Sequence, residues 1–242
     1  MLYAIFADTH SNLEAYQAFI EDSEKEGIRE YFCVGDIVGY GADPHQCIEL
    51  TKQLNCQVVC GNHDWAAAEK LNIEYFNRYA REAALWTQER LDDIDKNYLA
   101  SLTPVFQDRE LTLVHGTLEY PEDFEYVTDV RIAARTIHAQ LTPVCFIGHS
   151  HVAGVFYDSR SGRINYTTIP EITIQEGKRY LVNVGSIGQP RDGDWRASYC
   201  IYDTEKESLR IKRISYDVER AREKILKAGL PKHLADRILI GR

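Results

Sequence analysis

The stretch Gly61-Asn62-His63-Asp64 follows an apolar run at residues 57–60, so we expect it on the loop that leaves the end of a buried strand. Four other apolar runs end in the same way, each in a residue that can bind a metal or carry a proton. These endings are Asp8-Thr9-His10, Gly35-Asp36, His115-Gly116 and Gly148-His149-Ser150-His151. Because an open α/β sheet brings the carboxyl ends of its strands to one edge, the five endings predict one shared site there.

The length and charge of the chain limit what such a site can serve. At 242 residues the chain suits one large domain or two small ones. The formal net charge of −9 and the pI near 5.4 argue against stable nucleic-acid binding, which normally needs a basic face. A nucleotide substrate is still compatible with this charge, because metal ions can supply a local positive field.

Cysteine usage and hydropathy predict a reduced, cytoplasmic protein. The six cysteines form no CxxC pair, and most lie in apolar strand or helix patterns, where a free cysteine behaves as a small hydrophobic residue. The first strand is expected to begin at Leu2, which leaves no room for a signal peptide, and no apolar run approaches membrane-spanning length. We therefore expect no membrane partner and leave a homo-oligomer open.

Helical patterns alternate with strands in the first half of the chain. Residues 11–14 form a capping-box pattern ahead of an apolar helical stripe that closes at Gly27. Asp43 is expected to cap a second helix, whose first residue is Pro44. Residues 65–100 are helical in pattern and rich in aromatic side chains. We expect this block beside the site, with its rings either contacting a substrate or packing onto the domain.

Strand patterns dominate after residue 104. A helix is expected at 130–140, and short strands from residue 152 onward are expected to form a second, antiparallel sheet. The expected strands are 104–107, 111–115, 144–148, 152–158, 163–168, 172–175, 179–184, 197–203 and 208–215. The tail has the pattern of two helices broken at 229–231. We predict one domain, residues 1–216, with a C-terminal helical appendage at 217–242.

Two of the strand endings pair their side chains. In an extended segment, residues two apart point the same way, so Asp8 and His10 should face one point, as should His149 and His151. Imidazole and carboxylate ligands suit Mn, Fe, Co, Ni or Zn, and the lack of cysteine ligands argues against a structural zinc site. Seven candidate ligands are too many for one ion and match two ions that share a bridging carboxylate. They are Asp8, His10, Asp36, Asn62, His115, His149 and His151.

Each pattern on its own has an ordinary explanation. An isolated Asp-x-His is usually a chance match, Gly35-Asp36 a turn, and a lone His115 or His149 a buried histidine with satisfied hydrogen bonds. Asn62 alone could be a turn residue in the left-handed conformation. The five endings together, each with a metal-competent side chain, favour a metal site over these separate explanations.

Taken together, the endings resemble the five-block motif of the calcineurin-like metallophosphoesterases. The matching blocks are Asp8-x-His10, Gly35-Asp36-x-x-Gly39, Gly61-Asn62-His63-Asp64, His115 and Gly148-His149-x-His151. The stretch at 183–191 also resembles the small bacterial and archaeal phosphodiesterase branch of that superfamily. The resemblance implies a four-layer αββα sandwich of two mixed sheets with a dinuclear metal centre at one edge.

The resemblance also implies a role for each site residue. One ion would be held by Asp8, His10 and His151. The other would be held by Asn62, His115 and His149, with Asp36 bridging the two. His63 matches the family's proton donor to the leaving group. Arg191, in a glycine-rich loop, is our candidate for binding the substrate, with a surface salt bridge as its ordinary alternative.

One departure separates this chain from the Ser/Thr protein phosphatases of the superfamily. Those enzymes follow the bridging aspartate with Asp-Arg-Gly, in which the arginine grips phosphate, whereas this chain has Gly39-Tyr40-Gly41. The departure argues against a protein phosphatase and leaves the phosphate-binding role to another residue.

We therefore expect a hydrolase, a dinuclear metal-dependent phosphoesterase that cleaves a small phosphoester or nucleotide by attack of a metal-bridging hydroxide. A phosphodiesterase is favoured over a phosphomonoesterase, and Mn over the other divalent ions. The alternatives are a Ser/Thr-type protein phosphatase, a dinucleoside polyphosphate hydrolase, a nuclease and a non-catalytic metal-binding adaptor, as a retromer subunit of this fold is. The acidic charge argues against a nuclease, and the complete ligand set argues against an adaptor.

Overall fold

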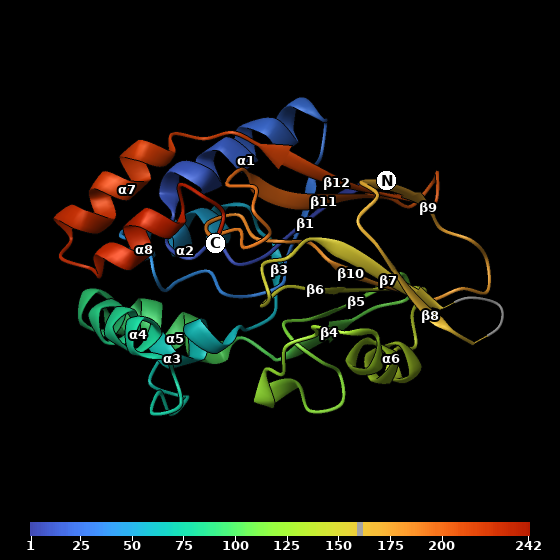
Figure 1. Cartoon of the computed structure of the whole chain (residues 1–242), viewed down its shortest axis with the longest axis horizontal. Helices are drawn as coiled ribbons and strands as arrows, with labels where there is room; N and C mark the ends of the chain where they lie inside the picture. The colour runs from blue at the N-terminus through green and yellow to red at the C-terminus, as the bar shows by residue number, and fades with distance from the viewer. Residues whose placement is uncertain (159–161) are drawn as a thin grey trace.

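The described residues form two mixed β-sheets of six strands each, which pack face to face with helices against their outer faces (Figure 1). The computed structural model describes residues 1–158 and 162–242. The predicted α/β sandwich of two mixed sheets is confirmed. Apolar side chains from both sheets fill the space between them, and the fully buried ones include Ile5, Val34, Leu113, Phe146 and Val182. The central strands are apolar throughout because both of their faces are covered.

The first sheet is built around β1 (Leu2–Phe6). On one side β1 pairs in parallel with β2 (Glu30–Cys33), which pairs in parallel with β3 (Gln57–Val58). On the other side β1 pairs antiparallel with β11 (Ala197–Asp203), and β12 (Ser208–Ile214) and β9 (Glu171–Thr173) complete the sheet. The three parallel strands therefore bring their carboxyl ends to the same edge.

The second sheet repeats this arrangement with different strands. Its parallel strands are β5 (Leu111–Val114), β6 (Val144–Ile147) and β10 (Tyr180–Asn183). Antiparallel strands flank them, with β4 (Val105–Gln107) beside β5, and β7 (Gly154–Asp158) and β8 (Ile164–Thr167) beyond β10. The carboxyl ends of β5 and β6 thus form a second row of strand ends.

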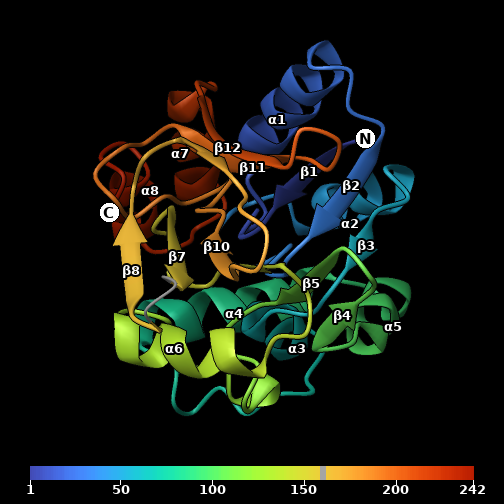
Figure 2. The same cartoon turned by 90° about the vertical axis from the view of Figure 1, so that its right-hand side faces the viewer.

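Helices cover both outer faces of the sandwich. On the side of the first sheet lie α1 (Leu13–Lys25), α2 (Pro44–Gln53), α7 (Val218–Lys227) and α8 (Lys232–Arg237), with α7 packed against α1. On the side of the second sheet, α6 (Val130–Ala139) contacts β7, β8 and β10 (Figure 2). At one end of the sandwich, α3 (Asn62–Ala67) packs against α4 (Arg78–Arg90) and α5 (Asp93–Ser101). The short 3-10 helix η1 (Pro121–Asp123) follows β5.

The C-terminal helices pack into the body of the domain. Leu230, Leu234 and Ile238 are buried in the same apolar cluster as Phe19 of α1. Lys224 of α7 binds the Glu14 carboxylate at 2.7 Å and the Asp43 carboxylate at 2.8 Å. Asp43 therefore makes an ion pair rather than the expected cap hydrogen bond at the start of α2. The domain boundary between residues 216 and 217 stays a prediction.

The strands after residue 152 do not form a sheet of their own, so that expectation is wrong. β7, β8 and β10 join the sheet of β5 and β6, whereas β9, β11 and β12 join the sheet of β1. A strand pattern shows which side chains are buried but not which strand lies alongside, because pairing is set by the backbone at long range. The predicted helical block is also interrupted, since residues 68–77 between α3 and α4 are not an α-helix.

All six cysteines lie in the described part of the chain as free thiols, five of them buried. Within residues 1–158 and 162–242, no helix is both long enough and apolar enough to cross a membrane.

Candidate metal centre

The predicted site residues lie where the strand ends of the two sheets meet. Asp8 and His10 follow β1, Asp36 follows β2, and Asn62 and His63 begin α3 just after β3. From the other sheet, His115 follows β5, while His149 and His151 follow β6. All of these side chains are buried, being at most 8% exposed. The two sheets together, rather than one sheet, therefore form the site.

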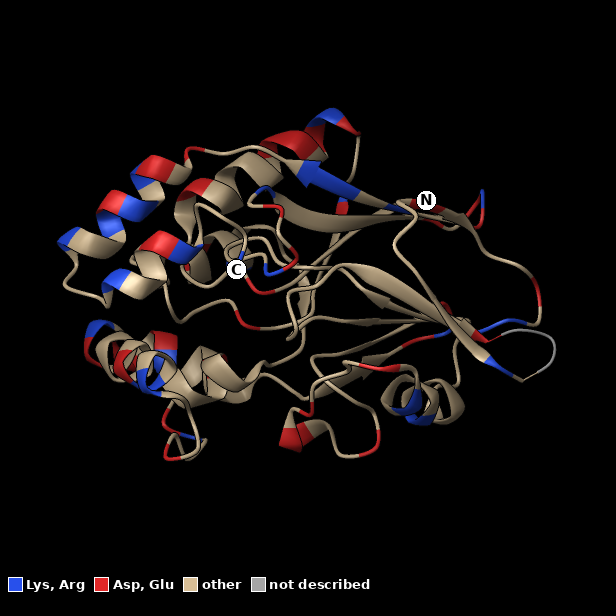
Figure 3. Cartoon of the chain, in the orientation of Figure 1, with Lys and Arg blue, Asp and Glu red and all other residues tan. Residues whose placement is uncertain are grey.

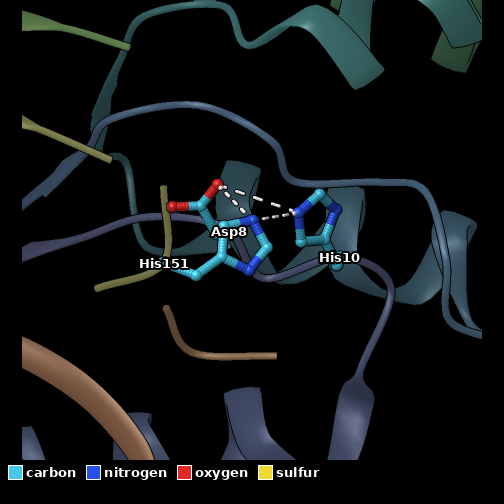
Figure 4. A group of neighbouring side chains, drawn as sticks. All are labelled: Asp8, His10 and His151. Atoms are coloured by element: carbon cyan, nitrogen blue, oxygen red, sulfur yellow. Dashed lines mark hydrogen bonds and ion pairs between the residues drawn. The ribbon is translucent and has the colours of Figure 1, made fainter. Parts of the chain in front are cut away.

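Six of the seven predicted ligands form two groups of three, each with ligand atoms within 4.8 Å of one another. In the group of Asp8, His10 and His151, the Asp8 Oδ1 and His10 Nε2 atoms lie 3.2 and 3.1 Å from His151 Nε2 (Figure 4). In the second group, His115 Nε2 lies 3.2 Å from Asp36 Oδ2 and 3.1 Å from His149 Nδ1. Two clusters of imidazole and carboxylate ligands at this spacing are consistent with a dinuclear metal site.

The Asp36 carboxylate lies between the two groups. Its Oδ2 is 3.6 Å from His10 Nε2 in the first group and 3.2 Å from His115 Nε2 in the second. Its Oδ1 accepts a hydrogen bond from the backbone N–H of His63 at 2.8 Å, which fixes the orientation of the carboxylate. This position suits the predicted bridging role.

Backbone carbonyl groups fix the ring orientation of three of the histidines. The Nδ1 atoms of His10, His115 and His151 each lie against a carbonyl oxygen, that of Val38 at 3.0 Å, Val34 at 2.7 Å and Gln189 at 2.5 Å. When Nδ1–H donates to the carbonyl, the Nε2 lone pair points into the site. Metal-binding histidines are commonly oriented by such a second hydrogen bond.

Two buried oxygen atoms in the site have no hydrogen-bond partner in the described part of the chain. They are Asp8 Oδ1 and Asn62 Oδ1. A buried polar atom without a partner costs about 1–3 kcal/mol, so such atoms are rare unless a ligand completes them. The unpartnered oxygens and the inward-facing imidazole nitrogens fit a pair of divalent ions. This mixture of nitrogen and oxygen ligands does not select among Mn, Fe, Co, Ni and Zn.

The electrostatic field at Asp36 favours a cation. Burial acts to raise the pKa of the Asp36 carboxyl, but the nearby imidazoles of His115 and His63 hold it well below its usual range. Burial acts to lower the pKa of His115, but the Asp36 carboxylate outweighs this effect and raises the pKa to about 9. The same negative charge that holds a proton on His115 would attract a metal ion to this position.

The site residues adopt a different backbone conformation from the one expected. Asp8 and His10 have φ values of 55° and 49°, and His149 and His151 have 65° and 60°. These values lie in the left-handed region, so the expectation of extended pairs is wrong, although each pair does converge. A non-glycine residue there costs of order 1–3 kcal/mol and needs support from its surroundings.

Glycines allow the site loops to approach one another closely. A Cβ added at Gly61 would lie 2.1 Å from Asp36 Oδ1, and one added at Gly148 would lie 2.6 Å from Asp8 Oδ2. Both distances are shorter than any ordinary van der Waals contact. These two glycines therefore let the backbone reach the carboxylates that the site needs.

Asp64 is a site residue whose role the sequence analysis missed. Its carboxylate accepts four backbone hydrogen bonds, from Asp36, Ile37 and Val38 at 2.8, 2.8 and 3.3 Å and from Gly61 at 2.9 Å. It therefore joins the loop after β3 to the loop after β2 and holds Asp36 in place. Its position in the Gly-Asn-His-Asp stretch was the available signal.

The segment 183–191 donates hydrogen bonds to the loops that carry the site residues. Asn183 Nδ2 donates to the Gly148 carbonyl at 2.8 Å, and Ser186 Oγ donates to the Asp8 carbonyl at the same distance. Arg191 lies nearby, with its guanidinium carbon 5.7 Å from the centre of the Tyr40 ring and an Nη2 hydrogen bond of 2.9 Å to Gln189. Its Nε is buried and has no hydrogen-bond partner among the described residues. Arg191 is thus held at the site rather than in a surface ion pair.

His63 stands beside the two groups and belongs to neither. Its ring centre lies 5.0 Å from that of His10 and 4.4 Å from that of Tyr40. Its Nδ1 faces Gly39, where an added Cβ would lie only 2.7 Å away. Burial lowers the pKa of His63 to about 4, with the Asp36 carboxylate acting in the opposite direction. The imidazole is therefore neutral at pH 7 until an anion approaches it.

Comparison with known proteins agrees with this geometry. The calcineurin-like phosphoesterase superfamily domain matches residues 1–207. A metallophosphoesterase from Sphaerobacter thermophilus is 36% identical and superposes with a TM-score of 0.87 over 100% of this chain and 99% of its own. An uncharacterized protein of Methanocaldococcus jannaschii is 39% identical over 100% of this chain and 98% of its own length. A hypothetical protein from Pyrococcus horikoshii shares the fold at 21% identity, with a TM-score of 0.80 over 100% of this chain and 98% of its own.

Replacement of Asp64 by asparagine should loosen the site. In Asp64→Asn an amide N–H₂ takes the place of one oxygen and faces backbone N–H donors, so about two of the four hydrogen bonds are lost. We expect a loss of about 2 kcal/mol or more in the free energy of unfolding, measured with urea, together with weaker metal binding. Asp129→Asn is the control, because Asp129 caps α6 from an exposed position and asparagine caps about as well. Equal stability of both variants would refute the role given to Asp64.

Proposed function

The chain belongs to the calcineurin-like phosphoesterase superfamily and is a metal-dependent phosphoesterase, and on that premise we propose that it prefers phosphodiesters to phosphomonoesters. The metal-dependent activity rests on the two His/Asp groups, and the preference rests on Tyr40, which stands where the protein phosphatases have an arginine. We assign Asp8, His10 and His151 to one ion and Asn62, His115 and His149 to the other, with Asp36 between them. When bound, two divalent ions activate water and stabilise the charge on the phosphoryl oxygens.

The positive charge that the chain itself supplies suits a singly charged phosphate. A phosphomonoester carries up to two negative charges and a phosphodiester one. The Asp-Arg-Gly arginine of the protein phosphatases is replaced here by Tyr40, whose ring lies against His63. Arg191 then remains as our candidate for binding a phosphate oxygen, through the buried Nε that lacks a partner in the described chain. The loss of the Asp-Arg-Gly arginine removes one positive charge from the phosphate site, which supports the diester as the substrate of lower charge.

His63 is our candidate for the proton donor. Because Nδ1 is turned toward Gly39, Nε2 is the atom that can reach a substrate oxygen in the adjoining pocket, which His63 lines. The anionic phosphate of a bound substrate would favour the protonated ring and offset the effect of burial on its pKa. The reaction places the oxygen of water on phosphorus, breaks the bond from phosphorus to the leaving oxygen, and requires a proton on that oxygen. Nε2–H of His63 can deliver it.

Metal analysis tests the ligand assignment. The purified protein, dialysed after loading with Mn²⁺, should retain two ions per chain. Asp36→Asn should weaken both positions, because it removes the charge of a carboxylate that lies between the two groups. Asp203→Asn is the control, since Asp203 pairs with Leu2 at the opposite end of β1 from Asp8. Two tightly bound ions in Asp36→Asn would show that Asp36 does not bridge them.

A substrate comparison tests the preference for diesters. With Mn²⁺, the protein should hydrolyse bis(p-nitrophenyl) phosphate with a higher kcat/KM than p-nitrophenyl phosphate, although both release the same leaving group. The expected difference is about tenfold or more, since a single mismatched charge at a partly buried site is worth more than 1 kcal/mol. A higher kcat/KM for the monoester would overturn the preference.

Varying the leaving group of the substrate distinguishes a proton donor at His63 from a metal ligand. A general acid contributes roughly 10²–10⁴-fold to rate, and mainly for leaving groups that depart poorly without a proton. His63→Ala should keep both ions, lose most activity on an alkyl phosphodiester and lose much less on a nitrophenyl diester. His149→Ala should instead lose an ion and depress both reactions together. Equal losses on the two esters in His63→Ala would assign the imidazole to phosphate binding, and loss of metal would make it a ligand.

A further inference from the structure

A pocket of about 640 Å³ opens directly beside the candidate metal centre. Asn62, His63 and His149 form its inner end, and residues of the 71–80 segment and of the 122–126 segment form its walls. A group attached to phosphorus on the side of His63 would extend into this space. The volume lies in the range of small-molecule sites, so it can hold a whole substituent rather than a single atom.

The walls of the pocket are largely aromatic. The Phe76 ring centre lies 5.1 Å from that of His63, and Tyr126 stacks on His149 with ring centres 3.7 Å apart and planes 18° apart. Phe124 and Tyr40 also line the space. Tyr75 lines it too and is 92% exposed, so its ring is left open to solvent. Aromatic faces of this kind stack well on planar rings.

The aromatic rings of the block 65–100, which were expected either to contact a substrate or to pack onto the domain, lie in two different places. Phe76 and Tyr75 line the pocket. Trp86 instead donates its Nε1–H to the Ala228 carbonyl at 3.1 Å, and Tyr79 stacks on His233 of α8. The second pair of rings therefore ties the block to the C-terminal helices, and only the first pair faces the space beside the metal centre.

The pocket carries negative rather than positive charge. Glu122 and Asp123 of η1 line it, and Figure 3 shows the acidic colour of this short helix. Among the described residues that line the pocket there is no lysine or arginine. The carboxylates of Glu122 and Asp123 would repel a leaving group with several phosphates, which costs electrostatic free energy.

We propose that this pocket binds the leaving group of the substrate, and that the leaving group is an uncharged alcohol carrying a planar aromatic ring, such as a nucleoside. This inference rests on the proposed function, because it assumes hydrolysis at the adjoining metal centre. It assigns stacking on the ring to Tyr75 and Phe76, next to the candidate proton donor His63. It also separates the chain from the dinucleoside polyphosphate hydrolases, whose leaving groups are polyanions.

Three diesters that share a methyl phosphate group test the assignment. Their leaving alcohols are ethanol, uridine through its 5′-oxygen, and uridine that carries an additional 3′-phosphate. With Mn²⁺, kcat/KM should be about tenfold or more higher for uridine than for ethanol, as expected for stacking of one base. The 3′-phosphate should lower kcat/KM again. Equal values for uridine and ethanol, or a gain from the 3′-phosphate, would overturn the inference while leaving the proposed function in place.

Variants of the pocket test which side chains are responsible. Tyr75→Ala, at an exposed position that should not disturb folding, should lower kcat/KM more for the uridine ester than for the ethyl ester. The double variant Glu122→Gln/Asp123→Asn should reduce the discrimination against the 3′-phosphate. Leu141→Ala is the control, because Leu141 is 78% exposed and lies outside the pocket. The same loss on both esters in Tyr75→Ala would contradict stacking by this ring.

Binding of uridine, which has no phosphoester to hydrolyse, tests the pocket independently of the reaction. Titration calorimetry of the Mn²⁺-loaded protein with uridine should show saturable binding that Tyr75→Ala weakens several-fold and Leu141→Ala leaves unchanged. No detectable uridine binding, in a protein that hydrolyses diesters, would overturn the pocket assignment alone. Hydrolysis of none of the three diesters would overturn the proposed function, whereas uridine binding weakened by Tyr75→Ala would still support the pocket.

Discussion

The four hydrogen bonds to the Asp64 carboxylate are the interaction on which the candidate centre depends. They join the loop after β3 to the loop after β2, and so set where Asp36 stands between the two His/Asp groups. A further hydrogen bond links the two sheets, since the backbone N–H of His149 donates to Asp8 Oδ2 at 3.0 Å. Together with backbone hydrogen bonds that continue beyond the strands, from Asp8 N–H to the Gly35 carbonyl at 2.9 Å and from Gly148 N–H to the His115 carbonyl at 3.1 Å, they fix the loops that carry the site.

Holding these loops in place has a cost in backbone conformation. Asp8, Asp36 and His149 all have positive φ, which side chains other than glycine rarely adopt. The surrounding contacts must outweigh this strain, and Gly61 and Gly148 make those contacts possible by leaving room for the carboxylates. The six ligand atoms of the two groups are thereby held close together.

The candidate ligands and the pocket beside them come from different parts of the fold. The strand ends of both sheets supply the metal-competent side chains, and the chain supplies them from five separate segments. The space beside them is formed by the segment between α3 and α4 and by η1, outside the sheets. Loops of this kind generally vary more than the strands and helices that they connect. The superfamily fold can therefore support one reaction on different substrates.

The strands and the gathering of the candidate ligands could be predicted from the sequence, but the surroundings of these ligands could not. Apolar runs ending in Asp8, Asp36 or His115 predicted the strands and their convergence, because strand period and end chemistry are local properties that a sequence displays. The fold was needed to show that residues 197–203 pair with β1, that Asp64 accepts hydrogen bonds from four N–H groups, and that Phe76 and Tyr126 face one pocket. These features join residues far apart in the chain, and a local pattern cannot show which distant partner a buried face or a carboxylate will meet.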